Sequence, residues 1–193
     1  MLSTLDRRVT RNTLGLPLDE KIVIFVGRVD PSKGILELLN SIKYSQNGFH
    51  LLLLLAGWGN SPFMEQVQHA LGKLHKSKIT VVWNRSDIVD YIAASDILIM
   101  PSLREGKGTV QFEAMACGIP CICSNLKSIT ESLPKNLLQF TFNPESKEDI
   151  LNKLNKALST KFTREEKRNL RDYVSKNFSV DILVKKYEGI LAC

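Results

Sequence analysis

Short apolar runs alternate along this chain with segments in which apolar residues recur every three or four positions. Each short run is followed by a cluster of Gly, Pro, Ser, Asn or Asp. This alternation predicts a parallel sheet whose strands are joined by helices. The predicted strands cover residues 21–26, 50–56, 78–83, 96–100, 120–124 and 136–141. The predicted helices cover residues 35–44, 62–75, 86–94, 110–116, 147–158, 164–176 and 180–191.

The chain length suits one folding unit. The 193 residues, 44% of them apolar, are enough for one α/β domain with a substantial core. We expect an open parallel sheet of about six strands flanked by helices, with further helices at the C-terminal end. Residues 1–20 are expected to form a linker or helix that precedes a Rossmann-like domain at residues 21–193.

The composition excludes several classes of protein. The aliphatic content is too high for a disordered chain, and the longest apolar runs are far shorter than the roughly 20 residues of a spanning helix. Residues 1–11 mix acidic and basic side chains, unlike a signal peptide, so we expect a cytoplasmic protein. Cys117, Cys121 and Cys123 lack the spacing of a zinc site, and we expect reduced thiols in the core.

The charge does not by itself indicate nucleic-acid binding. There are 26 Lys and Arg against 20 Asp and Glu, and eight of the basic residues lie between Lys161 and Lys186. Acidic residues are interleaved with them, which is typical of a solvated helix surface. No aromatic stacking motif accompanies these cations, so we expect no nucleic-acid partner.

Loops that leave the carboxyl ends of parallel strands meet at one crevice, where ligands bind. Here these loops cover residues 27–34, 57–60, 84–87, 101–109 and 125–128. They are rich in glycine and contain several cations, among them Arg28, Lys33, Arg85 and Lys107. The pattern predicts an anionic ligand.

Phosphate binding would explain the glycines and cations together. Gly106, Gly108 and Thr109 precede a predicted helix start, where backbone N–H groups and the helix dipole favour an anion. Arg28 and Lys33 would add mobile positive charge. Glycines that only form turns and cations that are only solvated are the alternative for each motif taken singly. The spacing of a P-loop or of a dinucleotide fingerprint is absent, and the three histidines share no metal spacing.

Two carboxylates accompany these loops. Glu105 and Glu113 lie eight residues apart, and a carboxylate suits the vicinal hydroxyls of a ribose or a hexose. The alternatives are a surface charge at Glu105 and a favourable helix-dipole position at Glu113.

These residues together resemble a known family. The resemblance to the group 1 (family four) glycosyltransferases of GT-B fold extends from about Leu14 onward. It is carried by Ala94-Ser95-Asp96 through Pro101-Ser102, Glu105-Gly106-Lys107-Gly108, Glu113-Ala114-Met115-Ala116-Cys117-Gly118-Ile119-Pro120, Phe25-Val26-Gly27-Arg28, Lys33-Gly34 and Asn177-Phe178-Ser179. The E-x7-E element is the most specific of these motifs.

The resemblance implies a function and a set of site residues. It implies retaining transfer of a sugar from a nucleotide-diphospho-sugar such as a UDP- or GDP-sugar, with no metal and no cofactor besides this donor substrate. Arg28 and Lys33 would hold the diphosphate, Glu105 the donor hexose and Glu113 the ribose, with Glu105, Arg28 and Lys33 as the catalytic set. The remaining donor-binding residues would be Gly27, Gly57, Asn84, Arg85, Gly106, Lys107, Gly108 and Thr109.

The sequence also departs from the family. Lys107 stands where an aromatic residue is common, and with Gln111 it leaves the sugar open. Only the second, donor-binding half of a GT-B fold is recognisable, so the acceptor would be held by another domain or subunit, through which peripheral membrane association is also expected. The isolated chain would then need that partner for activity. The alternative is a non-catalytic nucleotide-sugar-binding or regulatory module.

Overall fold

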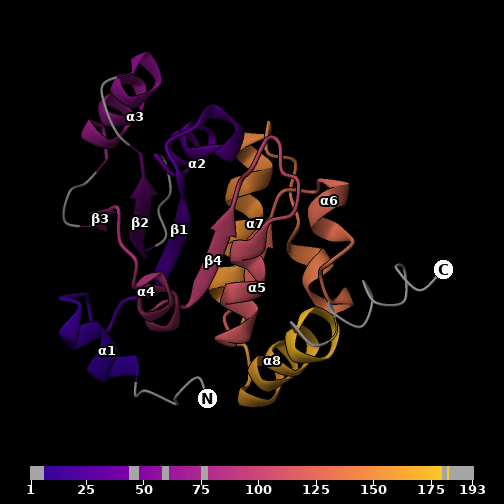
Figure 1. Ribbon diagram of the computed structural model, residues 1–193. Helices are drawn as coiled ribbons and strands as arrows, with labels where there is room; N and C mark the ends of the chain where they lie inside the picture. Colours follow the sequence, from indigo (N-terminus) through magenta and orange to yellow (C-terminus); the bar gives the residue numbers. More distant parts are fainter. Residues whose placement is uncertain (1–6, 44–47, 58–60, 75–77, 180–181, 183–193) are drawn as a thin grey trace.

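Five parallel strands form a single sheet in the order β3-β2-β1-β4-β5 (Figure 1). The computed structural model describes residues 7–43, 48–57, 61–74, 78–179 and 182. The strands are β1 (Ile22–Arg28), β2 (His50–Ala56), β3 (Ile79–Trp83), β4 (Ile97–Met100) and β5 (Cys121–Cys123). The predicted α/β class, with an open parallel sheet, is therefore confirmed.

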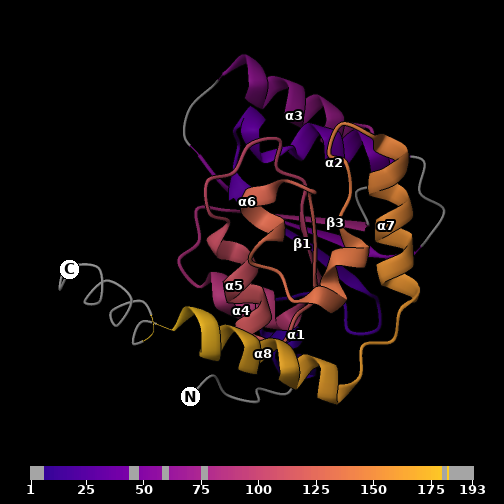
Figure 2. The ribbon, with the colours of Figure 1, turned by 90° about the vertical axis from the view of Figure 1, so that its right-hand side faces the viewer.

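Helices cover both faces of this sheet, which gives three layers (Figures 1 and 2). One layer contains α2 (Ile35–Ile42), α3 (Pro62–Gly72) and α7 (Lys147–Ser159). The other contains α1 (Arg7–Thr13), α4 (Ile88–Ala94), α5 (Thr109–Ala116) and α8 (Arg164–Phe178). The short α6 (Lys127–Thr130) follows β5. The predicted helix at 180–191 lies outside the described residues except for Ile182.

The core lies on the two central strands. Residues 22–25 of β1 and 51–55 of β2 are all buried, which is why both strands are continuous apolar runs and do not alternate with polar residues. The edge strand β3 is only partly buried, and Trp83 at its end is 40% exposed. Continuous apolar runs in the sequence therefore identify β1 and β2 more clearly than the edge strand β3.

The strand register aligns the carboxyl ends of three strands. Arg28 pairs with Ala56, and Leu55 pairs with Trp83. The loops after β1, β2 and β3 consequently begin at one edge of the sheet, the upper edge in Figure 1, where the β4–α5 loop also lies.

One predicted strand is wrong. Residues 136–140 belong to a 3₁₀ helix, η3 (Lys135–Phe140), which ends at the cap residue Thr141, and the sheet has five strands. Leu137 and Phe140 are both buried, whereas Gln139 between them is exposed, and this spacing of three is that of a 3₁₀ helix. Strand-like behaviour is limited to Phe142, which forms a parallel bridge with Ser124.

The cysteines of the described chain are free thiols. Cys121 and Cys123 are buried, as expected, while Cys117 at the end of α5 is only partly buried. Burial raises the pKa of the Cys121 thiol well above its ordinary value, and it raises the pKa of Cys117 as well. These thiols are therefore protonated at neutral pH and pack as small apolar groups.

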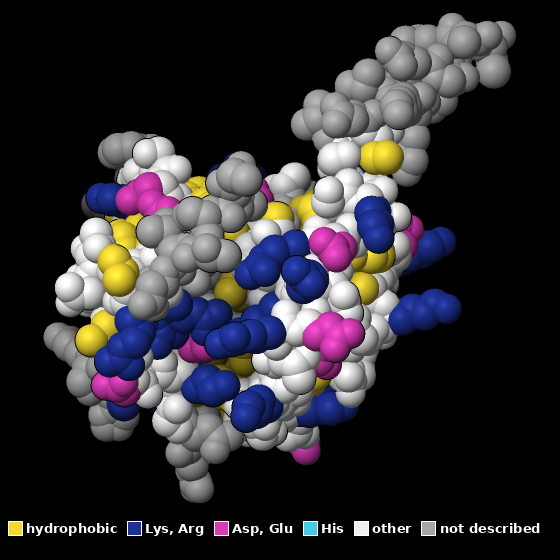
Figure 3. Space-filling view, turned by 90° about the horizontal axis from the view of Figure 1, so that it is seen from below, with side chains coloured by type: hydrophobic (Ala, Val, Ile, Leu, Met, Phe, Trp, Pro, Cys, Tyr) yellow, Lys and Arg dark blue, Asp and Glu magenta, His cyan; other side chains and the backbone are white. Residues whose placement is uncertain are grey.

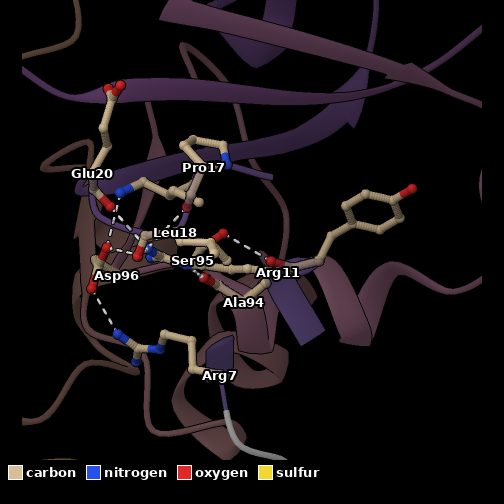
Figure 4. A network of polar contacts seen from close by, with 10 residues as sticks. Arg7, Arg11, Pro17, Leu18, Glu20, Ala94, Ser95 and Asp96 are labelled. Carbon is tan, nitrogen blue, oxygen red and sulfur yellow. Dashed lines mark hydrogen bonds and ion pairs between the residues drawn. The ribbon is translucent and has the colours of Figure 1, made fainter. Parts of the chain in front are cut away.

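Asp96 ties the first described helix to the sheet (Figure 4). Its Oδ1 accepts a hydrogen bond from Arg7 Nη1 at 2.6 Å, and its Oδ2 accepts from Arg11 Nη2 and from the backbone N–H of Ile22, both at 2.8 Å. Arg11 is 4% exposed and also donates to four backbone carbonyl groups, those of Ala94, Pro17, Leu18 and Glu20. Buried polar groups of this segment are thus satisfied by one guanidinium and one carboxylate.

No helix among the described residues has the length and apolar character needed to cross a bilayer.

Candidate functional site

The loop after β1 is shaped by its own side chains. Asp30 caps the 3₁₀ turn η1 (Pro31–Lys33), because its carboxylate accepts a hydrogen bond from the backbone N–H of Ser32 at 2.8 Å. The Ser32 hydroxyl donates to the same Asp30 oxygen. Both hydrogen bonds lower the pKa of Asp30, so the cap is ionised at neutral pH.

This loop is fastened to the loop after β4. The carbonyl of Ser32 accepts hydrogen bonds from the backbone N–H groups of Leu103 and Arg104, at 2.8 and 3.2 Å. Gly34 follows with φ 67°, and a Cβ at that position would lie 1.8 Å from the carbonyl oxygen of Pro101. Only glycine permits this approach, and it sets the spacing between the predicted phosphate loop and the loop that contains Glu105.

Lys33 and Glu105 form an ion pair across these two loops. The distance from Lys33 Nζ to Glu105 Oε2 is 2.8 Å, and the side chains are 25% and 13% exposed. Ser102 donates a hydrogen bond to the same carboxylate oxygen at 3.3 Å, and Ser128 Oγ donates to the Glu105 carbonyl at 2.7 Å. The Glu105 side chain and backbone are therefore both held in place.

Helix α5 begins beside this pair. Gly108 precedes it without a side-chain cap, and a Cβ at Gly108 would lie 2.6 Å from the terminal methyl group of Met100. The N–H groups of a first helical turn lack partners within the helix, so this end of α5 favours an anion. Thr109 and Glu113 are one turn apart and share a helix face. Gly106, Lys107 and Thr109 are exposed, and Glu113 is partly buried.

The loops after β2 and β3 are also joined. The backbone N–H of Gly57 donates to Asn84 Oδ1 at 3.1 Å, and Asn84 Nδ2 donates back to the Gly57 carbonyl at 3.4 Å. Asn84 has φ 50°, a left-handed conformation that asparagine tolerates better than most residues. The Asn84 side chain thus holds the backbone of Gly57, another predicted donor-binding position.

Arg85 is oriented by its neighbours. Its Nε and Nη2 donate to the two carboxylate oxygens of Asp87 at 2.8 and 2.6 Å, and its guanidinium lies 5.9 Å from the centre of the Tyr91 ring. These hydrogen bonds raise the pKa of Arg85 and lower that of Asp87.

A small cavity of about 170 Å³ joins Arg28 to Arg85. These two arginines line it together with aliphatic side chains from β1, β2 and α4. Its lining consists of Val26, Gly27, Arg28, Leu54, Leu55, Ala56, Arg85 and Ile88. An apolar slot with cations beside it suits a flat aromatic group attached to a phosphate.

The structure brings the predicted site residues together in two groups. Lys33 contacts Glu105, and Arg28 shares a cavity with Arg85 and Gly27. Among the described residues, no hydrogen bond or ion pair joins the Glu113 carboxylate to either group. No cluster of three or more His, Cys, Asp or Glu suited to a metal occurs in the described part of the chain.

Sequence reasoning missed two residues of this site. Ser102 and Ser128 hold Glu105; Ser102 lies in the loop after β4, and Ser128 lies in α6, in a segment that the sequence predicted as the loop after the fifth strand. Their position in those loops was the available signal, but serine is so common in loops that it indicates no particular partner.

Comparison with known proteins gives the same family over most of the chain. The family described as glycosyl transferases group 1 matches residues 6–177. An uncharacterized glycosyltransferase, MJ1607 of Methanocaldococcus jannaschii, is 26% identical over 176 residues, which cover 91% of this chain and 43% of that protein. The TuaC protein of Bacillus subtilis, a putative teichuronic acid biosynthesis glycosyltransferase, is 29% identical over 126 residues, or 65% of this chain and 30% of that protein.

Solved structures share the fold. A glycosyltransferase from Rickettsia africae superposes with a TM-score of 0.85 at 22% identity, over 98% of this chain and 52% of that one. Anabaena Alr3699/HepE in complex with UDP gives a TM-score of 0.86 at 22% identity, over 99% of this chain and 54% of that one. The chain spans less than half of these two curated relatives and about half of these solved chains, and its fold is consistent with the second half of a GT-B fold. This protein belongs to the group 1 glycosyltransferase family.

Proposed function

We propose that this chain is the donor-binding domain of a retaining glycosyltransferase. Its ligand is a nucleotide-diphospho-sugar, which is the substrate that supplies the transferred hexose. The acceptor is held by a further domain or a partner subunit, so that the sugar is transferred in the cleft between the two. The coverage of the relatives supports this division, because their chains are about twice as long or longer.

The ion pair between Lys33 and Glu105 carries the proposal. Both residues belong to the motifs that resemble the family. They lie 72 residues apart in the sequence, in two different loops, and the distance between their charged atoms is 2.8 Å. A diphosphate that binds Lys33 competes with Glu105 for the ammonium group. The released carboxylate then accepts hydrogen bonds from the hydroxyls of the hexose next to that diphosphate.

Charge stabilisation is the chemical role of the two cations. Breaking the bond between the sugar and the diphosphate leaves negative charge on the departing nucleotide. Arg28 and Lys33 lower the energy of that charge if they contact the phosphates, and the first turn of α5 adds backbone N–H donors from Gly108 and Thr109. Glu105, Arg28 and Lys33 are therefore the catalytic set that we propose.

The nucleoside has a separate place in this proposal. Glu113 lies on the same face of α5 as Thr109 and would accept hydrogen bonds from the ribose hydroxyls. The cavity between Gly27, Arg28 and Arg85 would receive the base, with Asn84 and Gly57 keeping the shape of its outer loops. The complex of Anabaena Alr3699/HepE with UDP supports uracil as the first base to test.

A ligand panel measured by thermal unfolding tests the binding step. UDP-, GDP- and ADP-glucose are compared, and a ligand at 100 times its Kd stabilises the fold by about 2.7 kcal/mol. Arg28→Met and Lys33→Met should each remove most of this stabilisation. Lys135→Met, which removes an exposed lysine of η3, is the matched control and should leave it unchanged. Equal stabilisation by the ligand in the original chain and in all three variants would contradict the assignment of Arg28 and Lys33 to the diphosphate.

Transfer is tested separately from binding. After addition of the acceptor-binding half of a relative, the anomeric configuration of the product is followed by NMR. Retention of configuration supports the proposal. Binding of the nucleotide-sugar without any transfer would instead favour the non-catalytic binding module.

A further inference from the structure

A basic face lies at the end of the sheet opposite the candidate donor site. Figure 3 shows Lys and Arg side chains gathered on the lower side of the molecule, where α1 and α8 lie in Figure 1. We define this basic face by six residues. They are Arg7, Lys21, Arg164, Lys167, Arg168 and Arg171.

Helix α8 segregates its charges. Four of its five basic residues stand at positions 164, 167, 168 and 171, and this spacing places them on one side of the helix, away from Lys176. Glu165 and Asp172 are seven residues apart and lie on another side. Glu166 is engaged in the capping box with Thr163, whose backbone N–H and hydroxyl both donate to it. Acidic and basic residues alternate in the sequence of α8, but in the folded helix these four basic residues form one stripe.

Lys167 lies within electrostatic range of three other cations of this face. Burial lowers the pKa of Lys167, and the positive charges of Arg7, Lys21 and Arg171 lower it further, while Asp96 acts in the opposite direction. Asp96 is already paired with Arg7 and Arg11. Its carboxylate cannot neutralise the cluster, so the face has an excess of positive charge that a bound anion would relieve.

Within the described part of the chain, Arg164, Lys167 and Arg168 form no ion pair with a carboxylate. Arg171 donates a hydrogen bond to the backbone carbonyl of Cys117 at 3.3 Å and does not pair with an acid there either. These side chains can therefore reach an external anion without breaking an ion pair.

Two exposed aliphatic side chains lie in the same chain segment as Arg7 and Lys21. Val9 on α1 is 56% exposed, and Leu18, beside Arg11 in Figure 4, is 36% exposed. Cations together with aliphatic groups suit the boundary between lipid headgroups and acyl chains. A surface for single-stranded nucleic acid would instead need aromatic side chains for base stacking, and the six basic-face residues and these two neighbours supply none.

We propose that the basic face docks this protein on a bilayer surface rich in anionic phospholipids. The lysines and arginines contact lipid phosphates, and Val9 and Leu18 enter the headgroup region. The candidate donor site lies at the other end of the sheet and stays accessible to a nucleotide-sugar from the aqueous side (Figure 1). This proposal does not depend on the proposed function, because it concerns a separate surface.

Vesicle co-sedimentation of the full chain is the test. Vesicles of phosphatidylcholine alone are compared with vesicles that contain 40% phosphatidylglycerol, at 0.1 M and 0.5 M NaCl. We expect binding to the anionic vesicles at low salt and its loss at high salt, because the Debye length falls well below its value of about 10 Å at 0.1 M. Equal binding to both vesicle types, or no binding to either, overturns the proposal.

Charge-neutralising variants locate the surface. The double variant Lys167→Gln/Arg168→Gln should weaken partitioning onto the anionic vesicles on the order of 30-fold, because each cation near an anionic surface contributes about 1 kcal/mol. The control Lys135→Gln/Lys147→Gln removes the same charge from η3 and α7 and should leave partitioning within about twofold of that of the original chain. Unchanged partitioning in the first variant, with unchanged thermal unfolding, overturns the assignment.

Two further measurements separate lipid from other polyanions. Val9→Ser/Leu18→Ser keeps every charge and should still reduce partitioning several-fold if these side chains enter the bilayer. A single-stranded RNA of random sequence is added as a competitor at equal phosphate concentration. Displacement of the protein from vesicles by that RNA would show a nucleic-acid surface and overturn the lipid proposal.

Discussion

Arg11 and Asp96 form a nearly buried ion pair between α1 and the start of β4, with 2.8 Å between Arg11 Nη2 and Asp96 Oδ2. Their side chains are 5% and 16% exposed. The same carboxylate oxygen accepts the backbone N–H of Ile22 at the start of β1. One side chain thus connects α1 with β1 and β4.

Removal of this carboxylate should destabilise the fold strongly. Asp96→Ala leaves the Arg11 guanidinium buried without its counter-charge, and breaking such a pair costs about 3–5 kcal/mol. Asp19→Ala is the matched control, because Asp19 pairs with Arg8 at 3.0 Å where both side chains are well exposed. That change should cost less than about 1 kcal/mol. Urea unfolding measures both, and similar losses in the two variants would contradict the structural role of Asp96.

The sequence predicted the strands of the core better than the contacts that lock them. Buried runs such as residues 51–55 are apolar at every position, so their pattern is clear without tertiary information. The strand predicted at 136–141 failed because Leu137 and Phe140 are spaced for a 3₁₀ helix, and a short apolar run does not distinguish these structures.

In the candidate site, too, the sequence predicted the positions of the residues but not the contacts between them. The glycines and charged residues of the loops identified the edge of the sheet and the positions Lys33 and Glu105. Their direct ion pair and the supporting bonds from Ser102 and Ser128 depend on which loops become neighbours. That information is set by strand order and lies beyond local sequence pattern.

Glu105→Gln should separate nucleotide binding from sugar binding, given the proposed function. The variant removes the partner of Lys33, so the ammonium group is free for the diphosphate, and UDP should bind at least as tightly as to the original chain. The additional affinity of UDP-glucose over UDP should fall, because an amide accepts fewer hydrogen bonds from hydroxyls than a carboxylate does.

Calorimetry with UDP and with UDP-glucose measures this difference. Glu131→Gln, which changes an exposed acid after α6, is the control and should alter neither affinity. A loss of UDP affinity in Glu105→Gln as large as that in Lys33→Met would show that Glu105 does not compete for the lysine.

Gln111 should be replaceable by an apolar side chain with a gain in stability. It is fully buried on α5, and among the residues that the structure describes neither its Nε2 nor its Oε1 has a hydrogen-bond partner. A buried polar group without a partner costs about 1–3 kcal/mol, and methionine has a similar shape without this cost. Gln111→Met should therefore raise the free energy of unfolding by about 1 kcal/mol. Gln66→Met, on the exposed face of α3, should change it by less than about 0.5 kcal/mol.

His50 should make stability depend on pH in the acid range. It lies at the start of β2, is 6% exposed, and its Nε2 is 2.8 Å from Thr80 Oγ1. Burial lowers its pKa in the folded protein below the ordinary value of 6.5, while the neighbouring cations Lys78 and Arg11 act in the same direction and Glu20 opposes them. The unfolded chain therefore binds a proton first as the pH falls. The contribution of this neutral histidine is complete well above pH 6.5 and is lost progressively as the pH falls from 6.5 through the folded-state pKa.

Urea unfolding of the original chain, His50→Gln and His69→Gln between pH 8 and pH 5 measures this contribution. Carboxylates titrate in the same acid range, so the difference between variants is the relevant quantity. His50→Gln should reduce the loss of stability between pH 7 and pH 5, because glutamine does not titrate. His69 is exposed on α3, and its replacement should leave the pH dependence unchanged. If His69→Gln flattened the profile as much as His50→Gln, the pH dependence would not come from the buried histidine.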